Sequence, residues 1–222
     1  MLNRQQARDV DRRAIEDYGM SGLVLMENAA RGCVDYLLQQ GVSGSVAICC
    51  GGGNNGGDGF AMARRLELLG HAVEVFLFAS EDRLQGDAAA NYAILQRAQT
   101  PLFHAADWSE ETLGNRLRNA QWIVDALLGT GAKGAPRPPY DRVLETLNAV
   151  DANKLAIDLP SGMDCDSGKV ASVAFRGDHT CTFVDRKLGF AAETAPQFTG
   201  RVCVVDIGIP KKLMEEVLAE AS

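Results

Sequence analysis

Residues 46–60 read VAICCGGGNNGGDGF, an apolar run followed directly by a glycine-rich tract. Consecutive apolar residues, as at 46–50, are typical of a strand that is buried on both faces. The six glycines among residues 51–59 indicate a loop whose backbone can approach a ligand closely, before a helix that we expect to begin at about Phe60. The stretch therefore predicts a buried strand, a ligand loop and a helix in succession.

Six further strand-like runs occur along the chain, with helical stretches between them. They cover residues 73–78, 102–104, 122–127, 155–159, 180–184 and 202–207. Helices are expected over residues 5–18, 23–40, 61–69, 88–97, 140–150 and 211–221, and Ser109 can cap another. This alternation predicts an α/β fold in which crossover helices cover both faces of a mostly parallel sheet. A thin apolar stripe on the first helix would pack either on the domain or on a second subunit.

Composition restricts the class of protein. The chain has 222 residues, a size that favours one domain over residues 1–222. Its 22 basic and 29 acidic side chains give a net charge of −7, which disfavours nucleic acid as a partner. Because we find neither a signal segment nor a membrane span, we expect a cytoplasmic protein without membrane contact. The six cysteines form no C-x-x-C pair, so we expect buried, reduced thiols.

Ligands of a parallel sheet bind beyond the carboxyl ends of its strands. In the first loop at that edge, free backbone amides and the positive end of the following helix favour an anion such as phosphate. Asn54, Asn55 and Asp58 add oxygen atoms that a plain turn does not need, which favours a ligand loop. Residues 129–137 read GTGAKGAPR and place amides, a hydroxyl group and two cations at another strand end. We expect the two loops to hold one anionic ligand.

Two carboxylates interrupt apolar strand sequence. Asp125 lies within the run 122–127, and Asp158 closes a later one. A buried carboxylate is costly unless it is paired, so Asp125 is either a ligand-binding residue or a structural aspartate that the protein itself satisfies. Ser161 has neither a G-x-S-x-G context nor a placed histidine, which makes a hydrolase the weaker interpretation. Lys187 either faces the same crevice or is solvated at its strand end.

Five motifs occur in order along the chain: MENA at 26–29, NNGGDG at 54–59, DALLGTG at 125–131, IDLPSG at 157–162 and KLG at 187–189. Together they resemble the NAD(P)H-hydrate epimerase family, known as the YjeF N-terminal domain, over essentially the whole chain. The resemblance implies a Rossmann-like three-layer αβα sandwich, often a homodimer. It also implies an isomerase that interconverts the R and S forms of NADHX and NADPHX, the hydrated nicotinamide nucleotides. A separate or fused dehydratase would then repair them.

The resemblance further implies functional positions. Substrate-binding positions are Asn54, Asn55, Gly56, Gly57, Asp58, Gly129, Thr130, Gly131, Ala132, Lys133, Gly134, Ala135 and Asp158. Potassium (K+) ligands are Asn55, Asp125 and Ser161, all of which offer hard oxygen atoms, and the cation would give Asp125 a partner. The neighbourhood of Lys187 departs from the family, because Asp185 and Arg186 stand where less charged residues are usual.

The substrate determines the expected chemistry. Its C6 carbon carries a hydroxyl group next to N1, so either loss of hydroxide or opening of the C6–N1 bond erases the stereocentre. We expect Asp158 to act as acid/base and electrostatic partner, with Lys187 orienting or protonating. Two alternatives remain open: an NAD(P)-dependent dehydrogenase that uses Gly51, Gly53 and Gly56 as its G-x-G-x-x-G fingerprint, and a non-catalytic nucleotide-binding or scaffold module.

Overall fold

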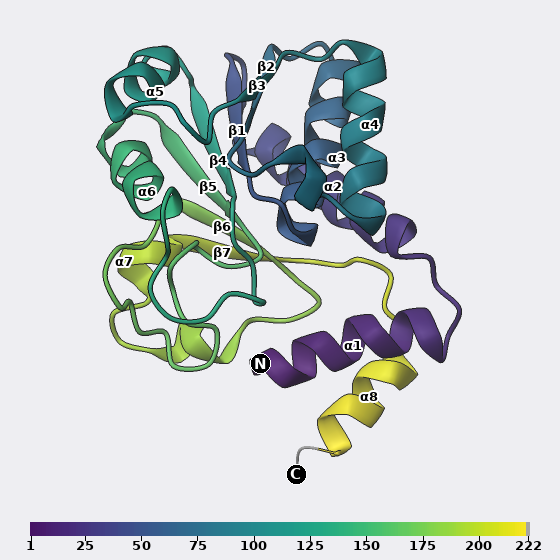
Figure 1. Cartoon of the computed structure of the whole chain (residues 1–222). Helices are drawn as coiled ribbons and strands as arrows, with labels where there is room; N and C mark the ends of the chain where they lie inside the picture. Colours follow the sequence, from purple (N-terminus) through teal and green to yellow (C-terminus); the bar gives the residue numbers. More distant parts are fainter. Residues whose placement is uncertain (221–222) are drawn as a thin grey trace.

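A parallel sheet organises the chain (Figure 1). Within residues 1–220, which the computed structural model describes, seven strands pair in the order β3-β2-β1-β4-β5-β6-β7, every neighbouring pair parallel. They are β1 (Val46–Cys50), β2 (Val73–Leu77), β3 (Leu102–His104), β4 (Trp122–Ala126), β5 (Asn153–Ile157), β6 (His179–Phe183) and β7 (Arg201–Val205). The strand order reverses between β1 and β4, the place where such sheets bind ligands.

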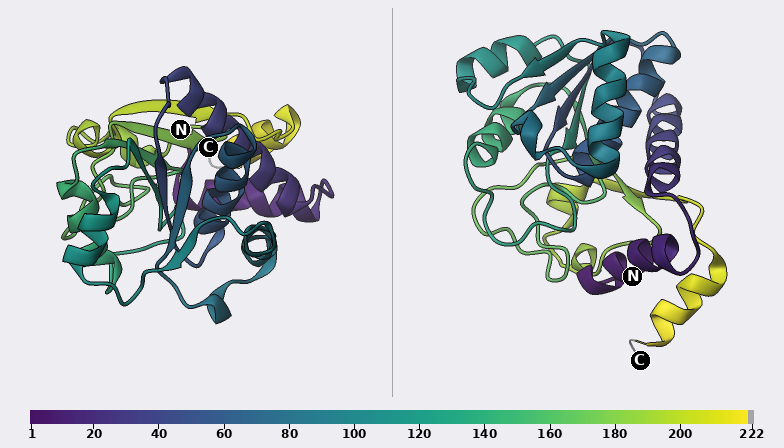
Figure 2. Two further views of the ribbon diagram at one scale, coloured as in Figure 1. Left: turned by 90° about the horizontal axis from the view of Figure 1, so that it is seen from above. Right: turned by 45° about the vertical axis from the view of Figure 1, so that its right-hand side comes forward.

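Helices cover both faces of this sheet (Figures 1 and 2). One face carries α2 (Gly22–Gln39), α3 (Asn54–Leu68) and α4 (Gly86–Ala98), and the other carries α5 (Glu110–Leu117) and α6 (Tyr140–Ala149). Side chains of β1 enter the two cores alternately: Val46, Ile48 and Cys50 pack in the first, and Ala47 and Cys49 in the second. The predicted three-layer α/β fold is therefore confirmed, and its two covered faces explain why the strand is apolar throughout.

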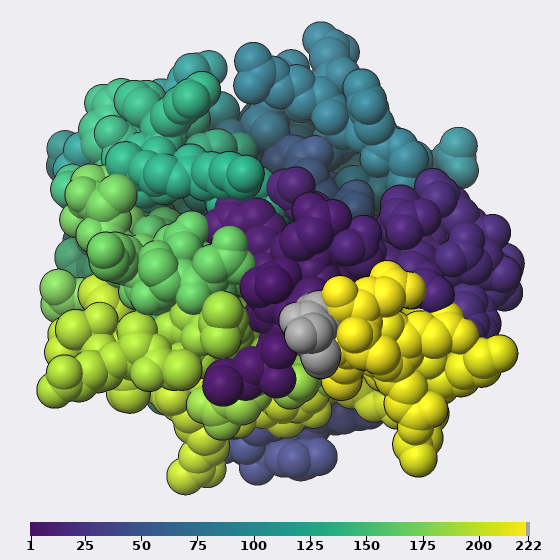
Figure 3. Space-filling view, turned by 90° about the horizontal axis from the view of Figure 1, so that it is seen from below, coloured from purple at the N-terminus to yellow at the C-terminus, as the bar shows by residue number. Residues whose placement is uncertain are grey.

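Helices α1 (Arg4–Glu16) and α8 (Lys211–Ala219) lie side by side beyond the carboxyl ends of the strands (Figures 1 and 2). Val10 and Ala14 of α1 are completely buried in the core of the chain itself. Arg13 joins the two helices through an ion pair of 3.0 Å to Glu220. Of the two options for the apolar stripe, packing on the domain is correct, although Ile15 remains exposed. In Figure 3 the N-terminal residues occupy the centre of the lower face.

The remaining elements are short, and most predicted boundaries are close to those observed. Two 3-10 helices, η1 (Glu81–Arg83) and η2 (Leu188–Ala191), and α7 (Pro196–Thr199) lie in connecting segments. Ser109 caps α5 as predicted, since its Oγ accepts a hydrogen bond of 3.1 Å from the amide of Thr112. Ala221, the predicted end of the last helix, lies outside the described residues.

Five strands, β2, β4, β5, β6 and β7, end one or two residues earlier than predicted, and at two of them the backbone shows a local reason. Asp158 follows β5 with φ 65°, and Val184 follows β6 with φ 69°. This left-handed conformation is unusual for residues with a side chain and is incompatible with an extended strand. Both turns lie at the carboxyl edge of the sheet, where strained backbone is common at functional sites.

The start of α3 was predicted incorrectly. The helix begins at Asn54 instead of about Phe60, so residues 54–59 are its first turns and not a loop. Gly56 explains the difference, because a Cβ atom there would lie 2.0 Å from the carbonyl oxygen of Gly51. The glycine lets the helix start in direct contact with the strand that precedes it. In this helix, glycine permits close packing where the sequence pattern indicated a loose loop.

Two expectations from composition can be compared with the structure. All six cysteines are free thiols, and all except the half-buried Cys203 are buried, as predicted. Among residues 1–220, none of the helices combines the length and the apolar character needed to cross a bilayer.

The packing of Gly56 generates a prediction. Gly56→Ala forces a methyl group against the main chain and should lower the free energy of unfolding by about 1–3 kcal/mol or more. Gly114→Ala is the matched control: Gly114 is also helical, but its Cβ atom would meet only Thr146 Cγ2, at 3.8 Å. This control should raise stability by about 0.5–1 kcal/mol. Urea unfolding measures both, and equal stability of the two variants would contradict the packing argument.

Candidate functional site

A cavity of about 620 Å³ lies at the carboxyl edge of the sheet. Its walls come from the segments that follow β1, β2, β4, β5, β6 and β7, together with residues of α1 and the start of α3. The predicted site residues that line it are Asn54, Asn55, Asp58, Gly129, Thr130, Gly131, Ala132, Asp158 and Lys187. Segments far apart in the sequence therefore meet in one cavity, as expected for a site at this edge.

Asp158 and Lys187 form an ion pair in the cavity wall. Lys187 Nζ lies 2.9 Å from Asp158 Oδ1 and also donates a hydrogen bond of 3.0 Å to the carbonyl oxygen of Phe183. The lysine is only 2% exposed, so the alternative of a solvated lysine is wrong. Asp158 Oδ2 accepts a hydrogen bond of 3.1 Å from the amide of Thr130. One carboxylate therefore joins the turns that follow β4, β5 and β6.

Beneath the cavity, Asp125 and Ser161 form a buried polar pair. Ser161 donates to the Asp125 carboxylate from its Oγ at 2.7 Å and from its amide at 2.8 Å. The amide of Leu127 donates to the same carboxylate at 3.1 Å. Burial raises the pKa of Asp125 to about 6, although these hydrogen bonds act in the opposite direction. The carboxylate is thus well hydrogen-bonded but has no cationic side chain bonded to it among residues 1–220.

Asn55 lies in the first turn of α3 and lines the cavity. A Cβ atom at Gly129 would lie 3.4 Å from Asn55 Cγ and 3.2 Å from Asp158 Oδ2, so the glycine lets these two side chains approach each other. Asn55 Nδ2 is buried and has no hydrogen-bond partner among the described residues. Rotation of the amide group by 180° would present Oδ1 at that position, where an oxygen atom could bind a cation.

The predicted K+ ligands can be tested against these observations. Asp125 and Ser161 are in contact, and Asn55 supplies an unpartnered buried amide next to Gly129, in the loop that follows β4. The described residues contain no cluster of three or more His, Cys, Asp or Glu side chains suited to a metal ion. A cation here would therefore rely on one carboxylate and neutral oxygen atoms, a ligand set that fits a weakly charged, hard ion better than zinc.

Acidic side chains make the cavity electrostatically unusual. Burial raises the pKa of Asp58 well above its ordinary value, and the charges of Asp158 and Asp11 raise it further. Asp11, an exposed residue of α1, also lines the cavity. Desolvation of its carboxyl group and the charge of Asp158 raise the pKa of Asp11 to about 6, against the opposing effect of Lys187. Three carboxyl groups thus share one cavity with one buried ammonium group.

Sequence reasoning missed the contribution of α1 to this site. Arg8 and Asp11 line the cavity, as do Arg83 and Tyr140 from other segments. The sequence of the first helix shows an apolar stripe and charged residues of both signs. This pattern does not indicate which charged residues face a ligand. Arg8 and Asp11 reach the cavity because α1 lies across the carboxyl ends of the strands.

Some predicted substrate residues lie elsewhere. Gly56 and Gly57 are buried in α3 and do not line the cavity. Lys133, Gly134 and Ala135 line a smaller neighbouring cavity of about 200 Å³, which shares Gly129 and Ala132 with the larger one. The second predicted loop is therefore divided between two cavities.

Comparison with known proteins identifies the family to which the chain belongs. The sequence model of the family described as YjeF-related protein N-terminus matches residues 22–189. The NAD(P)H-hydrate epimerase of Pirellula staleyi is 43% identical over 98% of this chain and 96% of its own length. The epimerase of Rhodopirellula baltica is 42% identical over 96% of this chain and 86% of its own length.

A longer relative and a solved structure extend the comparison. The bifunctional NAD(P)H-hydrate repair enzyme Nnr of Moorella thermoacetica is 38% identical over 92% of this chain, which spans 40% of that protein. The crystal structure of yeast ynu0 (YNL200c) superposes with a TM-score of 0.83 over 98% of this chain and 93% of its own, at 23% identity, a likeness of fold alone. Because the family model covers most of the chain and the relatives align over nearly all of it, the chain belongs to the YjeF-related protein N-terminus family.

Proposed function

We propose that this chain is an NAD(P)H-hydrate epimerase, an isomerase that interconverts the R and S forms of NADHX and NADPHX. Relatives with that name align with 43% and 42% identity over nearly the whole chain. The observation that carries the proposal is the buried ion pair between Lys187 and Asp158 in the wall of a cavity large enough for a nucleotide. Two such side chains can exchange protons with a bound substrate.

The first turn of α3 suits the phosphate groups of such a substrate. Gly53, Asn54 and Asn55 line the cavity, and no side chain caps the helix. The free amides and the positive end of the helix macrodipole therefore remain available to an anion. The substrate positions carried over from the family, including Lys133 to Ala135 in the neighbouring cavity, belong to this proposal.

Epimerisation needs proton transfer at the C6 hydroxyl group and stabilisation of a cationic ring. Loss of hydroxide leaves positive charge on the ring, which the Asp158 carboxylate can stabilise. Lys187 can donate a proton to the departing oxygen, which then leaves as water. When water adds back on either face of the ring, Asp158 can accept its proton and return it to Lys187, 2.9 Å away. This chemistry leaves the oxidation state of the ring unchanged.

We further propose K+ as the resident cation, held by Asn55, Asp125 and Ser161. Their contacts and the unpartnered amide of Asn55 support this assignment. When bound, the ion supplies positive charge that offsets Asp125 and the phosphate charges of the substrate. The protein's own residues position the substrate and move the protons.

The proposal also includes a functional partner, an oligomeric state and a location in the cell. The chain would act with an NAD(P)H-hydrate dehydratase, either separate or fused, and the bifunctional relatives support the fused form. It would form a homodimer and work in the cytoplasm. Analytical ultracentrifugation and cell fractionation test the last two.

The central prediction concerns Asp158. Asp158→Asn should reduce epimerase turnover by about 10²–10⁴-fold, because the acid/base group is lost. Asparagine tolerates the left-handed backbone of this position, so the turn should be retained. Chiral separation of an R/S hydrate mixture over time measures turnover.

The control for this variant is Asp151→Asn, which changes an exposed aspartate outside the cavity. It should retain full turnover. Thermal unfolding must show both variants folded at the assay temperature. Normal turnover in folded Asp158→Asn would refute the acid/base assignment.

Potassium binding predicts a stability effect. In K+-free buffer with tetramethylammonium as the replacement ion, the wild type should lose activity and unfold at a lower temperature. At a K+ concentration of ten times its Kd, binding to the native state alone should add about 1.4 kcal/mol to the free energy of unfolding. Asp125→Asn should abolish this increment, whereas an equal K+ response in this variant would contradict the ligand assignment.

The raised pKa of Asp58 predicts a pH dependence of stability. The native state holds the Asp58 proton to higher pH than the unfolded chain, so its contribution to stability is lost as pH rises above about 4. The slope is at most about 1.4 kcal/mol per pH unit. Asp58→Asn should therefore become more stable than the wild type as pH rises from 5 to 8, measured by urea unfolding. A difference that is constant with pH would count against this assignment.

A further inference from the structure

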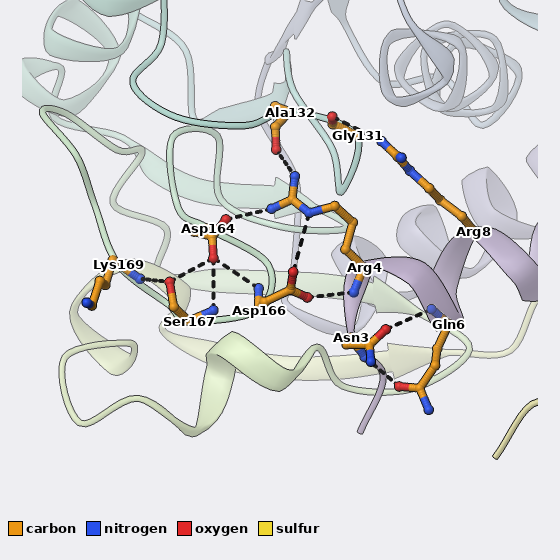
Figure 4. A network of polar contacts seen from close by, with 10 residues as sticks. All are labelled: Asn3, Arg4, Gln6, Arg8, Gly131, Ala132, Asp164, Asp166, Ser167 and Lys169. Atoms are coloured by element: carbon orange, nitrogen blue, oxygen red, sulfur yellow. Dashed lines mark hydrogen bonds and ion pairs between the residues drawn. The ribbon is translucent and has the colours of Figure 1, made fainter. Parts of the chain in front are cut away.

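The N-terminal segment contacts the site although it lies outside residues 22–189, the span of the family model. A capping box fixes the start of α1: Asn3 Oδ1 accepts a hydrogen bond of 2.8 Å from the amide of Gln6, and Gln6 Oε1 accepts one of 2.8 Å from the amide of Asn3. Arg4, the first residue of the helix, is thereby fixed in place (Figure 4). Local sequence thus determines where its side chain leaves the helix.

Arg4 connects two loops of the chain. Its guanidinium group donates to the carbonyl oxygen of Ala132 and, at 2.6 Å, to Asp164 Oδ2 (Figure 4). Its amide donates to Asp166 Oδ1 at 2.6 Å. The arginine is 5% exposed, and hydrogen bonds of this kind, between charged groups in a buried site, are strong and directional.

Asp164 is held in place for this contact. Its Oδ1 accepts hydrogen bonds from the Oγ of Ser167 at 2.7 Å and from the amide of the same residue at 2.9 Å. Burial by itself would raise the pKa of Asp164, but the bonds from Ser167 and the charge of Arg4 outweigh it and lower that pKa. Asp164 is therefore an ionised, oriented partner for the guanidinium group.

The loop that Arg4 holds is the one that contacts the proposed acid/base group. Residues 129–132 line the cavity, and the amide of Thr130 donates to Asp158 Oδ2. Arg8, one helical turn after Arg4, donates to the carbonyl oxygen of Gly131 at 3.3 Å. The carbonyl oxygens of Gly131 and Ala132 thus point toward α1 (Figure 4), while the amide of Thr130 points toward the Asp158 carboxylate.

The same segment also holds Lys187. The amide of Leu2 donates to the carbonyl oxygen of Arg186 at 2.8 Å, and the amide of Leu188 donates to the carbonyl oxygen of Leu2 at 2.8 Å. Leu2 therefore forms an isolated parallel bridge with Lys187. Both members of the ion pair are attached, through different loops, to the first residues of the chain.

We propose that Arg4 is a positioning residue for the epimerase reaction. It fixes the loop of residues 129–132 so that the Thr130 amide orients the Asp158 carboxylate toward the substrate. The inference rests on the function proposed above, and it assigns to the N-terminal segment a direct part in the geometry of the site.

The test compares Arg4→Ala and Arg4→Lys with the wild type, with Arg12→Ala as the matched control. Arg12 lies on the same helix but is half exposed, and within residues 1–220 its ion pairs are with Asp9 and Glu16. Arg4→Ala should lower kcat/KM about tenfold to a hundredfold, through both a lower kcat and a higher KM. Arg4→Lys should recover part of this loss, because an ammonium group cannot reach all the acceptors of a guanidinium group. Arg12→Ala should be unchanged.

Chemical rescue separates positioning from general stability. Free guanidinium ion at about 50 mM, well below denaturing concentrations, should restore activity to Arg4→Ala severalfold and leave Arg12→Ala unaffected. All variants are assayed well below their unfolding temperatures. If folded Arg4→Ala has kcat and KM within twofold of the wild type, the inference is overturned.

Hydrogen exchange provides a readout that does not depend on turnover. The amide of Thr130, which is bonded to Asp158, should exchange at least tenfold faster in Arg4→Lys than in the wild type, whereas amides of β1 should be unchanged. An inactive wild type would refute the proposed function. Unchanged exchange at Thr130 would refute the role of Arg4, whatever the activity.

Discussion

Lys187 is 2% exposed, and burying an ammonium group without a partner would cost several kcal/mol. Its environment supplies the carboxylate of Asp158 at 2.9 Å and the carbonyl oxygen of Phe183 at 3.0 Å. These contacts require the turns after β5 and β6 to lie side by side. The left-handed backbone at Asp158 and Val184 makes both turns sharp enough. The ion pair thus constrains the carboxyl edge of the sheet, and the cavity forms around it.

Close packing beneath the cavity brings together polar groups whose burial would be unfavourable if each were buried without a hydrogen-bond partner. Gly56 allows α3 to begin against the end of β1, which places Asn55 beside Gly129. Asp125 is completely buried, and its hydrogen bonds to Ser161 join the ends of β4 and β5. The resulting site combines one carboxylate with neutral donors, a composition that a bound monovalent cation would stabilise.

The N-terminal segment unites these parts although it lies outside the span of the family model. Arg4 contacts the turn of Asp164 and the loop of residues 129–132, while Leu2 contacts the segment that carries Lys187. Asp11 adds a carboxyl group to the cavity. The geometry of the cavity wall therefore depends on contacts between the first residues of the chain and loops more than a hundred residues later.

The sequence by itself determined the strands, the helices on both faces, and the positions at strand ends where Asp125, Asp158, Ser161 and Lys187 occur, because burial imposes a readable pattern of apolar residues. Only the tertiary structure decided that residues 54–59 are helical, that Lys187 is buried, that Lys133 lies in a second cavity, and that Asp11 faces the first. Those outcomes depend on contacts between distant segments. Local sequence does not reveal such contacts. Glycine occurs both in loops and where a helix starts in close contact with a strand. A charged residue on a helix gives the same sequence pattern whether its side chain faces water or a ligand.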